Sequence, residues 1–485
     1  MTDLIMKQQI LKRMRYDNPW WTDSKIPTDF SMMRNRLYVD SFYALVKTKK
    51  PTRGLILMGP RRVGKTVMLF HTIGRLIADG VSPRKIVYLS IDTPIYNSLS
   101  LEELLELACE ALVDHDGAMS GYYVFYDEVQ YLSNWEGHLK SLIDSYRDCK
   151  FVASGSAAAA LKMKSAESGA GRFTDFMLPP LTFNEYIHLL GLGHLIVPKQ
   201  IEWEGKRTDG FDTIDIDLLN KHFLNYINYG GYPELVLTEQ ARDNSSQYIH
   251  RDIIDKVLLK DLPSLYGIQD IPELYRLFSH IVYKSGSEFT YETLSKDSGV
   301  KKEIIKKYLQ YLQAAFLIKV VNRVDENART YQRATAFKIY LYNPSLRCAF
   351  FSPIGGDDDM LGNMVETAIY AQWLQRDNSE IYYARWKQSR KYLEVDIVGV
   401  DALRQKPYWA VEIKYTDRYI KQPSELDGLF TYMRKNQLKS AVVTTLSESA
   451  IKDCDGVTLQ FIPSAIYAYW VGHNTVNQRS GHHAH

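Results

Sequence analysis

Cysteine is scarce in this 485-residue sequence: the four present are Cys109, Cys149, Cys348 and Cys454, widely spaced and without a CxxC pair. A disulfide framework is therefore excluded, and a cysteine-based zinc site is disfavoured. Long apolar runs are also lacking, because no stretch approaches the roughly 18 residues of a membrane helix. The N-terminal segment 1–15 mixes apolar with charged residues and has no signal-peptide core. We expect a cytoplasmic protein with reduced, buried thiols and no membrane partner.

An excess of charge of either sign is lacking as well, since 59 basic and 57 acidic residues leave a net charge of +2. Any nucleic-acid contact must therefore come from a local basic patch and not from the field of the whole molecule. Apolar residues make up 45% and charged residues 24% of the chain, which is ordinary globular composition. At this length, about three domains of roughly 150 residues are expected.

Strand-like apolar runs at 55–58, 86–91, 122–126 and 151–154 alternate with longer helical segments. Alternation of this kind predicts a parallel sheet with helices on both faces, and hence an α/β fold.

A phosphate-binding loop is indicated directly after the first of these strands. Residues 59–66 fit GxxxxGK[ST] and are, in order, Gly59, Pro60, Arg61, Arg62, Val63, Gly64, Lys65 and Thr66. They lie between an apolar strand and the helical run 67–78, a context that a chance Gly-rich turn does not have. The glycines let the backbone wrap a β-phosphate, Lys65 would reach the β- and γ-oxygens, and Thr66 would ligate magnesium. The loop predicts ATP and Mg²⁺ as cofactors.

Two adjacent carboxylates, Asp127 and Glu128, end the run 122–126. We expect Asp127 to hold magnesium, usually through water, and Glu128 to orient or deprotonate the attacking water. The alternative for such a pair is a helix N-cap.

Two further residues are candidates for the ATP site. Ser156 follows the strand 151–154 and either senses the γ-phosphate or belongs to an ordinary Ser/Gly turn. Arg172 could reach a phosphate in its own or a neighbouring subunit, with a solvated arginine as the alternative. The predicted catalytic residues are Lys65, Glu128 and Arg172.

Together these residues resemble AAA-type ATPases of bacteria and archaea that carry a C-terminal domain of unknown function related to restriction-endonuclease folds. The resemblance covers nearly the whole chain and implies an AAA+ core, a helical and winged-helix region, and a nuclease-like domain. It rests on the segments NPWW (18–21), GPRRVGKT (59–66), YDEVQ (126–130) with Trp135, GS (155–156), GR (171–172), LTFNEY (181–186), YGGYPE (229–234), Lys260-Asp261, EVDIV (394–398) and VEIK (411–414).

The expected organisation follows from these patterns and from composition. It is an aromatic and basic lead-in at 1–50, the AAA+ core at 51–197, an insertion loop and helical region at 198–280, a winged helix at 281–345, a PD-(D/E)xK-like α/β domain at 346–473 and a disordered tail at 474–485. The winged helix is suggested by a helix, a turn at Gly299, a second helix and a Val-rich strand pair.

The second of these helices has a basic face. Ile304, Ile305, Tyr308, Leu309 and Leu312 follow helical spacing, while Lys301, Lys302, Lys306 and Lys307 cluster toward the other side. The lysines either meet DNA phosphates or form a solvated face on a domain that packs against its neighbours.

A second constellation of charged residues lies toward the C-terminus: Glu366 on a helix, Asp396 on a strand, and Glu412 with Lys414 on the next strand. It matches the pattern of PD-(D/E)xK nucleases, in which carboxylates bind magnesium and the lysine positions or activates the hydrolytic water. The fold can also persist as a binding module that cleaves nothing. The nearby stretch 382–386, Tyr-Tyr-Ala-Arg-Trp, suits either nucleic-acid stacking or a half-buried strand.

We expect an ATPase that couples ATP turnover to DNA binding or processing by its C-terminal domains. Two alternatives stay open: a nucleotide-dependent switch that binds a protein partner and keeps an inactive nuclease-like scaffold, and an ATP-gated, metal-dependent DNA nuclease. DNA, a protein partner and a homo-oligomer are all compatible with the sequence.

Overall fold

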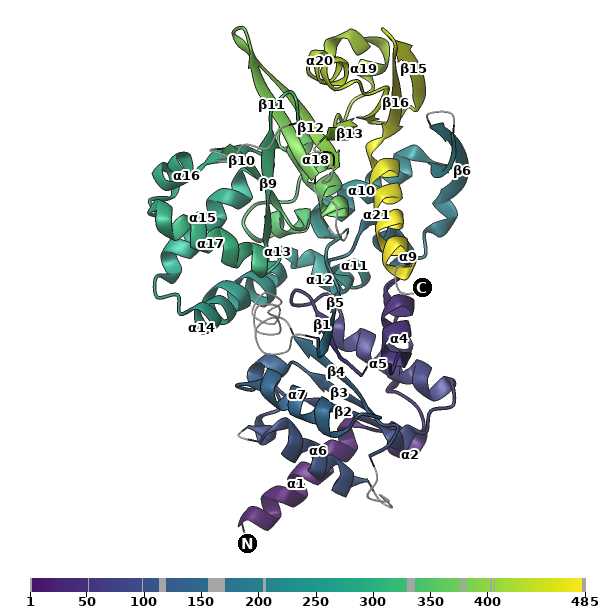
Figure 1. Ribbon diagram of the computed structural model, residues 1–485, viewed down its shortest axis with the longest axis vertical. Coiled ribbons are helices and arrows are strands. Elements are labelled where there is room, and N and C mark those ends of the chain that lie inside the picture. Colours follow the sequence, from purple (N-terminus) through teal and green to yellow (C-terminus); the bar gives the residue numbers. More distant parts are fainter. Residues whose placement is uncertain are drawn as a thin grey trace. The chain divides into compact units, whose positions relative to one another are not determined.

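The computed structural model describes residues 2–50, 52–97, 99–112, 119–155, 171–203, 206–328, 336–374, 376, 381–401, 404 and 406–481. The chain divides into an N-terminal unit, residues 1–179 with 479–485, and a C-terminal unit, residues 180–478 (Figure 1). No helix within the described ranges combines the length and apolar character that crossing a bilayer requires.

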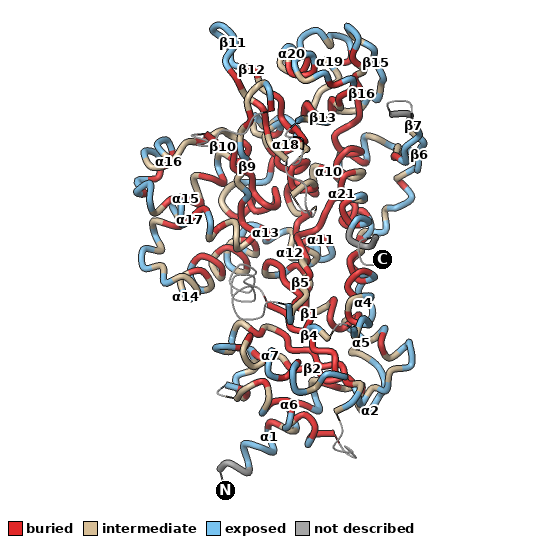
Figure 2. Tube along the Cα trace, viewed as in Figure 1, coloured by how far each residue is buried: buried red, intermediate tan, exposed pale blue. Residues whose placement is uncertain are grey.

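The N-terminal unit is built on a parallel sheet whose described strands follow the order β2-β3-β4-β1-β5. These strands are β1 (Gly54–Met58), β2 (Ile86–Ser90), β3 (Tyr123–Asp127), β4 (Lys150–Gly155) and β5 (Phe173–Met177). The first four coincide with the predicted strands, so the expected parallel α/β sheet is confirmed. β1 and β3 are buried along their whole length (Figure 2) because helices cover the sheet. The helices are α1 (Thr2–Asp17), α2 (Trp20–Asp23), α3 (Thr28–Ser31), α4 (Val39–Lys47), α5 (Lys65–Ala78), α6 (Leu101–Ala111) and α7 (Trp135–Ser145).

The segment 1–50 belongs to this unit and is joined to the edge strand β2. The Asn18 side chain accepts a hydrogen bond from the Tyr88 amide at 2.7 Å and donates one to the Tyr88 carbonyl at 2.9 Å, as a neighbouring strand would. Trp20 and Trp21 both donate their indole N–H to the carbonyl of Ile86. The NPWW segment therefore seals an edge that would otherwise expose unpaired backbone groups.

The C-terminal unit contains a nine-stranded sheet with the order β15-β16-β14-β13-β12-β11-β9-β10-β8. Its strands are β8 (Glu288–Thr290), β9 (Ile318–Val324), β10 (Ala336–Leu341), β11 (Ile381–Gln388), β12 (Lys391–Asp401), β13 (Lys406–Glu412), β14 (Ser440–Thr445), β15 (Ala450–Cys454) and β16 (Val457–Pro463). Parallel pairing of β9 with β11 joins the strands before residue 345 to those after it. One sheet thus runs through both the expected winged-helix region and the expected nuclease-like domain.

Helices surround this sheet. They are α9 (Phe183–Leu189), α10 (Ile216–Tyr229), α11 (Pro233–Leu237), α12 (Glu239–Asp243), α13 (Ser245–Tyr248), η5 (Ile249–Asp261), α14 (Leu262–Tyr266), α15 (Ile271–Tyr283), α16 (Tyr291–Ser298), α17 (Lys302–Ala314), η6 (Pro344–Ala349), α18 (Leu361–Trp373), α19 (Arg418–Lys421), α20 (Asp427–Asn436) and α21 (Ser464–Gly481). α20 packs on β12, where Leu429 and Met433 share a core with Val395 and Val398.

Two segments differ from the sequence expectation. The predicted insertion loop forms an antiparallel hairpin, β6 (Ile196–Trp203) and β7 (Lys206–Thr213), across which Lys199 pairs with Asp212 at 2.7 Å. The predicted disordered tail is helical as far as Gly481, since α21 buries Val476 and Thr475, whose hydroxyl bonds to carbonyls of Val471 and Gln372. Residues 482–485 lie outside the described residues.

Candidate nucleotide and carboxylate sites

The predicted phosphate loop connects β1 to α5 and has a backbone that needs its glycines. Gly64 has a φ of +91°, a left-handed conformation that glycine adopts without strain. A Cβ on Gly59 would lie 2.2 Å from the carbonyl oxygen of Leu178, so only glycine fits there. α5 begins immediately after Gly64 and presents its N-terminal N–H groups and positive dipole end to the loop.

The ammonium group of Lys65 is held by the loop itself. It donates to the carbonyl oxygens of Pro60 at 2.9 Å and Gly59 at 3.2 Å, and the residue is buried. The loop is braced from outside by Arg36, which donates to the carbonyls of Val63 at 2.6 Å and Pro179 at 2.9 Å. The loop thus holds the positive charge of Lys65 where phosphate oxygens would lie.

Asp127, at the carboxyl end of β3, is surrounded by neutral donors. One oxygen accepts hydrogen bonds from the hydroxyls of Thr66 at 2.7 Å and Tyr88 at 2.9 Å, and the other from the Ser154 hydroxyl and the Glu128 amide at 3.1 Å. Burial, together with the Asp127 charge, raises the pKa of Tyr88 well above its usual value, so this phenol stays a donor. The Thr66–Asp127 contact joins the two residues predicted to share magnesium.

Sequence reasoning did not find Tyr88 and Ser154. They reach Asp127 because β2 and β4 are the two neighbours of β3 in the sheet, a strand order that the sequence does not reveal.

Glu128 follows Asp127 in a left-handed conformation with a φ of 56°. Its carboxylate accepts a hydrogen bond from the Gln130 side chain, and the residue is half-buried. It is therefore fixed at the carboxyl edge of the sheet, next to the loop. Ser156, the predicted γ-phosphate sensor, lies outside the described residues.

Arg172 lies at the opposite end of the strands, where β1 and β5 begin. Its carbonyl accepts a hydrogen bond from the Gly54 amide, where β1 starts, and its side chain pairs with Asp144 at 2.8 Å. The loop follows the opposite end of β1, about 15 Å away for a five-residue strand. Arg172 thus makes no contact with the loop of its own chain in this structure, and action on a neighbouring subunit stays a prediction.

Comparison with known proteins agrees with this geometry. A family model described as an AAA domain matches residues 51–187. The chain therefore carries an AAA domain. A second model, described as a domain of unknown function, matches residues 220–357.

The chain also has distant relatives. Two uncharacterised proteins of Methanocaldococcus jannaschii are 24% and 21% identical, the first over 72% of this chain and 72% of the relative, the second over 65% and 66%. An uncharacterised protein of Haemophilus influenzae is 23% identical over 67% of this chain and 75% of the relative. Among solved structures, the Hsp104–ADP complex of Saccharomyces cerevisiae matches with a TM-score of 0.30 and 13% identity, over 62% of this chain and 40% of that one. A match at this TM-score supports no conclusion about this chain.

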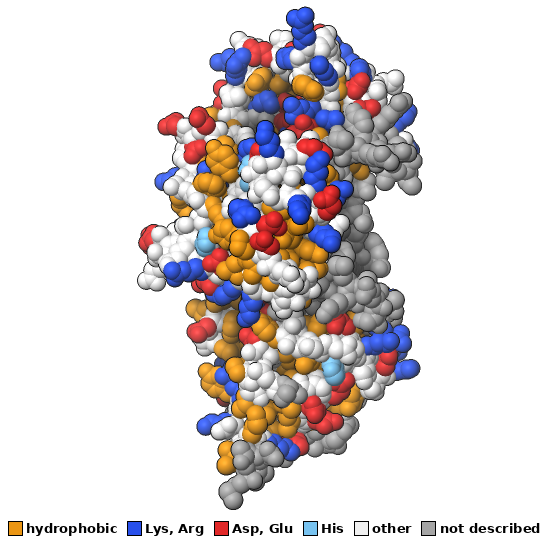
Figure 3. All heavy atoms as spheres, turned by 90° about the vertical axis from the view of Figure 1, so that its left-hand side faces the viewer, with side chains coloured by type: hydrophobic (Ala, Val, Ile, Leu, Met, Phe, Trp, Pro, Cys, Tyr) orange, Lys and Arg blue, Asp and Glu red, His pale blue; other side chains and the backbone are white. Residues whose placement is uncertain are grey.

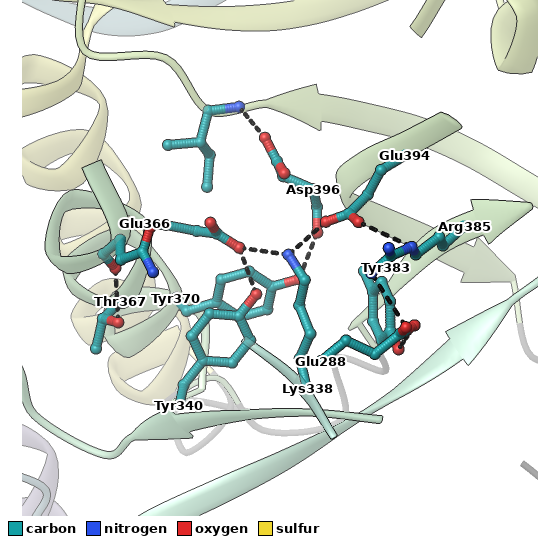
Figure 4. Close-up of polar contacts among 12 residues, drawn as sticks. Glu288, Lys338, Tyr340, Glu366, Thr367, Tyr370, Tyr383, Arg385, Glu394 and Asp396 are labelled. Carbon is teal, nitrogen blue, oxygen red and sulfur yellow. Dashed lines mark hydrogen bonds and ion pairs between the residues drawn. The ribbon is translucent and has the colours of Figure 1, made fainter. Parts of the chain in front are cut away.

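Outside the AAA domain, charged side chains from β10, α18, β11 and β12 gather in the C-terminal unit (Figure 4). Lys338 from β10 is buried, and its ammonium lies 2.8 Å from Glu366 on α18 and 2.6 Å from Glu394 on β12. Burial acts to lower the pKa of Lys338, but the two carboxylates raise it well above its usual value. Tyr340 donates a further hydrogen bond to Glu366 at 2.5 Å.

The other predicted residues of this constellation meet one strand further along. The Lys414 ammonium lies 2.7 Å from Glu412 and 3.7 Å from Asp396, and the Ile413 amide donates to Asp396 at 2.7 Å. Two carboxylates on neighbouring strands therefore share one ammonium. Burial, reinforced by the Asp396 charge, raises the pKa of Glu412 to about 7.

The chemistry of this carboxylate site fits a hard divalent cation in part. Oxygen donors from Asp396 and Glu412 are suitable ligands, and one Glu412 carboxylate oxygen is buried without a hydrogen-bond partner among the described residues. However, Lys414 lies between the two carboxylates. Within the described part of the chain, no three His, Cys, Asp or Glu side chains are grouped as ligands of one metal ion.

Glu366 belongs to the same cluster but is joined to it through Lys338. The structure thus brings Asp396, Glu412 and Lys414 together and adds Lys338, Tyr340 and Glu394, which the sequence analysis missed. No local signal marks Lys338, because it lies 28 positions before Glu366 on a strand of a different predicted domain.

The basic face of α17 is present as predicted. Lys301, Lys302, Lys306 and Lys307 are exposed, while Ile305, Tyr308, Leu309 and Leu312 are buried. Two of the lysines have partners in the chain, since Lys302 pairs with Glu292 at 2.5 Å and Lys306 lies over the Tyr291 ring. On the side of the molecule seen in Figure 3, basic and acidic side chains are interspersed, and no large surface of one sign is visible.

Proposed function

We propose that this protein hydrolyses ATP with magnesium at the AAA domain. The observation that carries the proposal is the hydrogen bond between Thr66 and Asp127, which joins the phosphate loop to the strand-end carboxylate beside Glu128. Mg²⁺, held by Thr66 and Asp127, would neutralise phosphate charge. Lys65 would bind the β- and γ-phosphate oxygens, and Glu128 would accept the proton of the attacking water.

The experiment is a measurement of ATP binding and phosphate release by the full chain and its Lys65→Ala variant. We expect the variant to lose binding and turnover together, because the Lys65 ammonium is the cation that the loop holds with its own carbonyl oxygens. Arg75→Ala on the same helix serves as control, since its side chain pairs with Asp40 on the surface. Normal turnover in Lys65→Ala would remove the loop from the proposed site.

We further propose that ATP turnover is coupled to nucleic acid bound by the C-terminal unit, and that the carboxylate site is a metal-dependent phosphodiesterase site. Two observations support this. The order α15, β8, α16, α17, β9, β10 is that of a winged helix, and Gly299 ends α16 with a φ of +75°, as expected for the turn. Asp396 and Glu412 lie close enough to contact one cation, with Lys414 beside them.

Turnover measured with and without DNA, and DNA integrity measured with Mg²⁺, separate the alternatives. Stimulation of the ATPase by DNA supports coupling, whereas a rate independent of DNA favours a nucleotide switch for a protein partner. Magnesium-dependent cleavage that Asp396→Ala abolishes without loss of ATPase activity supports the phosphodiesterase. Absence of cleavage would leave the carboxylate site a scaffold.

A further inference from the structure

The hairpin formed by β11 and β12 carries a concentrated basic segment. Residues 381–393 contain four cations, Arg385, Lys387, Arg390 and Lys391, and no acidic residue. At the end of the hairpin Lys387 faces Tyr392 and Gln388 faces Lys391, and the turn contains Ser389, with a φ of 55°, and Arg390. All the residues from 387 to 392 are exposed.

The two faces of the hairpin differ sharply. Trp386 pairs with Leu393, and Ala384 with Val395, on a face that is buried in the core beneath α20. Of the two alternatives for residues 382–386, nucleic-acid stacking or a half-buried strand, Trp386 fits the second. Its ring belongs to the core and cannot stack on a ligand.

The other face is open toward the tip. It carries Lys387 opposite Tyr392, then Arg385 opposite Glu394, and by strand alternation Asp396 next along β12. Tyr392 is 56% exposed, with the Arg385 guanidinium 5.1 Å from its ring centre. A file of side chains therefore leads from cations at the tip, past an exposed ring, to the carboxylate site.

We propose that the tip of the β11–β12 hairpin binds the phosphate backbone of nucleic acid and directs it to the carboxylate site. This inference rests on the proposed coupling to nucleic acid and names the surface that performs it. From Tyr392 to Asp396 is four residues, or about 13 Å of strand, which corresponds to about four phosphates along one strand of a duplex.

The tip differs from α17 in that its cations flank one turn and its outer face continues along β12 to the carboxylate site. Lys387 and Arg390 have no ion pair within the described chain, and Lys391 is 71% exposed although it lies 3.3 Å from Asp427. On the α17 face, Lys302 and Lys306 are engaged with Glu292 and Tyr291, while Lys301 and Lys307 are exposed. Cations without partners gain most by exchanging counterions for phosphates.

The test compares two variants of the full chain with equal change in charge. The tip variant is Lys387→Glu with Arg390→Glu and Lys391→Glu. The control is Lys12→Glu with Lys140→Glu and Arg147→Glu, three exposed cations of the N-terminal unit. Binding of a labelled DNA duplex is measured over a series of KCl concentrations. We expect the slope of log affinity against log salt to fall by roughly 2 to 3 in the tip variant and to change little in the control.

Tyr392→Ala provides a second measurement that does not involve charge. We expect it to weaken binding of single-stranded DNA about fivefold or more, because a base loses its stacking partner, while the salt slope stays that of the parent. ATP turnover without DNA and the urea denaturation of both units should match the parent in all three variants, which shows that they fold.

Each remaining outcome overturns the inference in a distinguishable way. A parent that binds DNA with a slope unchanged by the tip variant rejects the hairpin and keeps the nucleic-acid function. Equal losses in tip and control variants indicate a general field and not a surface. A parent that binds no nucleic acid rejects both, and tip-dependent binding of poly-glutamate as strong as that of DNA assigns the surface to an acidic protein.

Discussion

The AAA domain and the carboxylate site keep their lysines and carboxylates in opposite arrangements. In the AAA domain, Asp127 is bonded by hydroxyls and an amide, and Lys65 by carbonyl oxygens of its own loop. In the carboxylate site, Lys338 and Lys414 lie directly on acidic side chains. The charges of the first site are held apart, and those of the second neutralise one another.

This difference separates a site that requires a ligand from one that is balanced without it. Neutral donors around Asp127 leave its charge uncompensated, so that the Mg²⁺ proposed to accompany ATP would compensate it. The ammonium groups already compensate the carboxylates between which they lie. An arriving metal ion must therefore displace a lysine from these carboxylates or share the carboxylates with it. The comparison predicts that removing a lysine affects function in the AAA domain and stability in the C-terminal unit.

Lys338→Met breaks the balanced arrangement and has the largest expected effect. Glu366 would stay buried with only the Tyr340 hydrogen bond, and an ion pair broken inside a protein costs about 3–5 kcal/mol. We expect the free energy of unfolding of the C-terminal unit to fall by this amount in urea denaturation.

Lys319→Met on the neighbouring strand β9 is the control, because Lys319 is exposed and the change should stay within about 0.5 kcal/mol. If both variants are equally stable, the ammonium contributes nothing at Glu366, and the contrast between the two sites fails.

Glu128→Gln tests the functional half of the comparison. The amide keeps the shape of the side chain but cannot accept a proton, so ATP should still bind while turnover falls by roughly 10²-fold or more. Binding by fluorescent nucleotide and phosphate release measure the two effects separately. Turnover equal to that of the parent excludes Glu128 as the base.

A fourth lysine sharpens the comparison through pH. Lys150, at the start of β4, is buried and donates to the carbonyls of Thr48 at 2.8 Å and Arg53 at 3.3 Å, and burial lowers its pKa to about 8. Above pH 8 the folded chain releases this proton before the unfolded chain does, at about pH 10.4. The stability that the residue costs at pH 7 is therefore regained as pH rises, by roughly 2–3 kcal/mol.

The measurement is the difference in unfolding free energy between the parent and Lys150→Met from neutral to alkaline pH. This difference should shift in favour of the parent through pH 8 to 10. A constant difference would mean that Lys150 titrates as it does in water.

Tyr88→Phe should produce the smallest effect. It removes one of the donors to Asp127, which keeps Thr66 and Ser154. Loss of one such bond, about 1 kcal/mol, should raise the Mg²⁺ concentration for half-maximal turnover about fivefold and leave the rate at saturating Mg²⁺ nearly unchanged. Tyr126→Phe is the matched control, because its hydroxyl donates to Leu101 and not to Asp127. The same Mg²⁺ dependence in both variants would contradict a positioning role for Tyr88.

Local patterns explain why the AAA domain was predictable from the sequence. The loop residues 59–66 and the pair Asp127–Glu128 are each continuous in sequence, and the apolar strands around them follow directly from periodicity. What could not be predicted comes from strand order: Tyr88 and Ser154 reach Asp127 only because β2 and β4 flank β3. In the sequence, Asn18 stands out only as part of the NPWW segment. Its pairing with β2 could not be predicted, because it depends on β2 being an edge strand of the sheet.

The carboxylate site shows the limit more clearly. Glu412 and Lys414 are two residues apart, and side chains at this spacing along a strand point to the same side. Lys338 and Glu394, in contrast, come together through the pairing of β9 with β11, a contact between segments assigned to different domains. Composition was also a poor guide at 198–213, where a polar and charged stretch forms a hairpin, and at 474–481, where polar residues extend a helix.

The continuous sheet of the C-terminal unit has a mechanical consequence. A sheet has no hinge across its strands, so α17 and the carboxylate site cannot swing apart unless the β9–β11 hydrogen bonds break. A conformational change that reaches α17 or the carboxylate site must therefore rotate both as a single rigid body or twist the sheet between them. Expressing residues 346–473 alone would cut through this body and leave the edge of β11 bare, ready to pair with other chains.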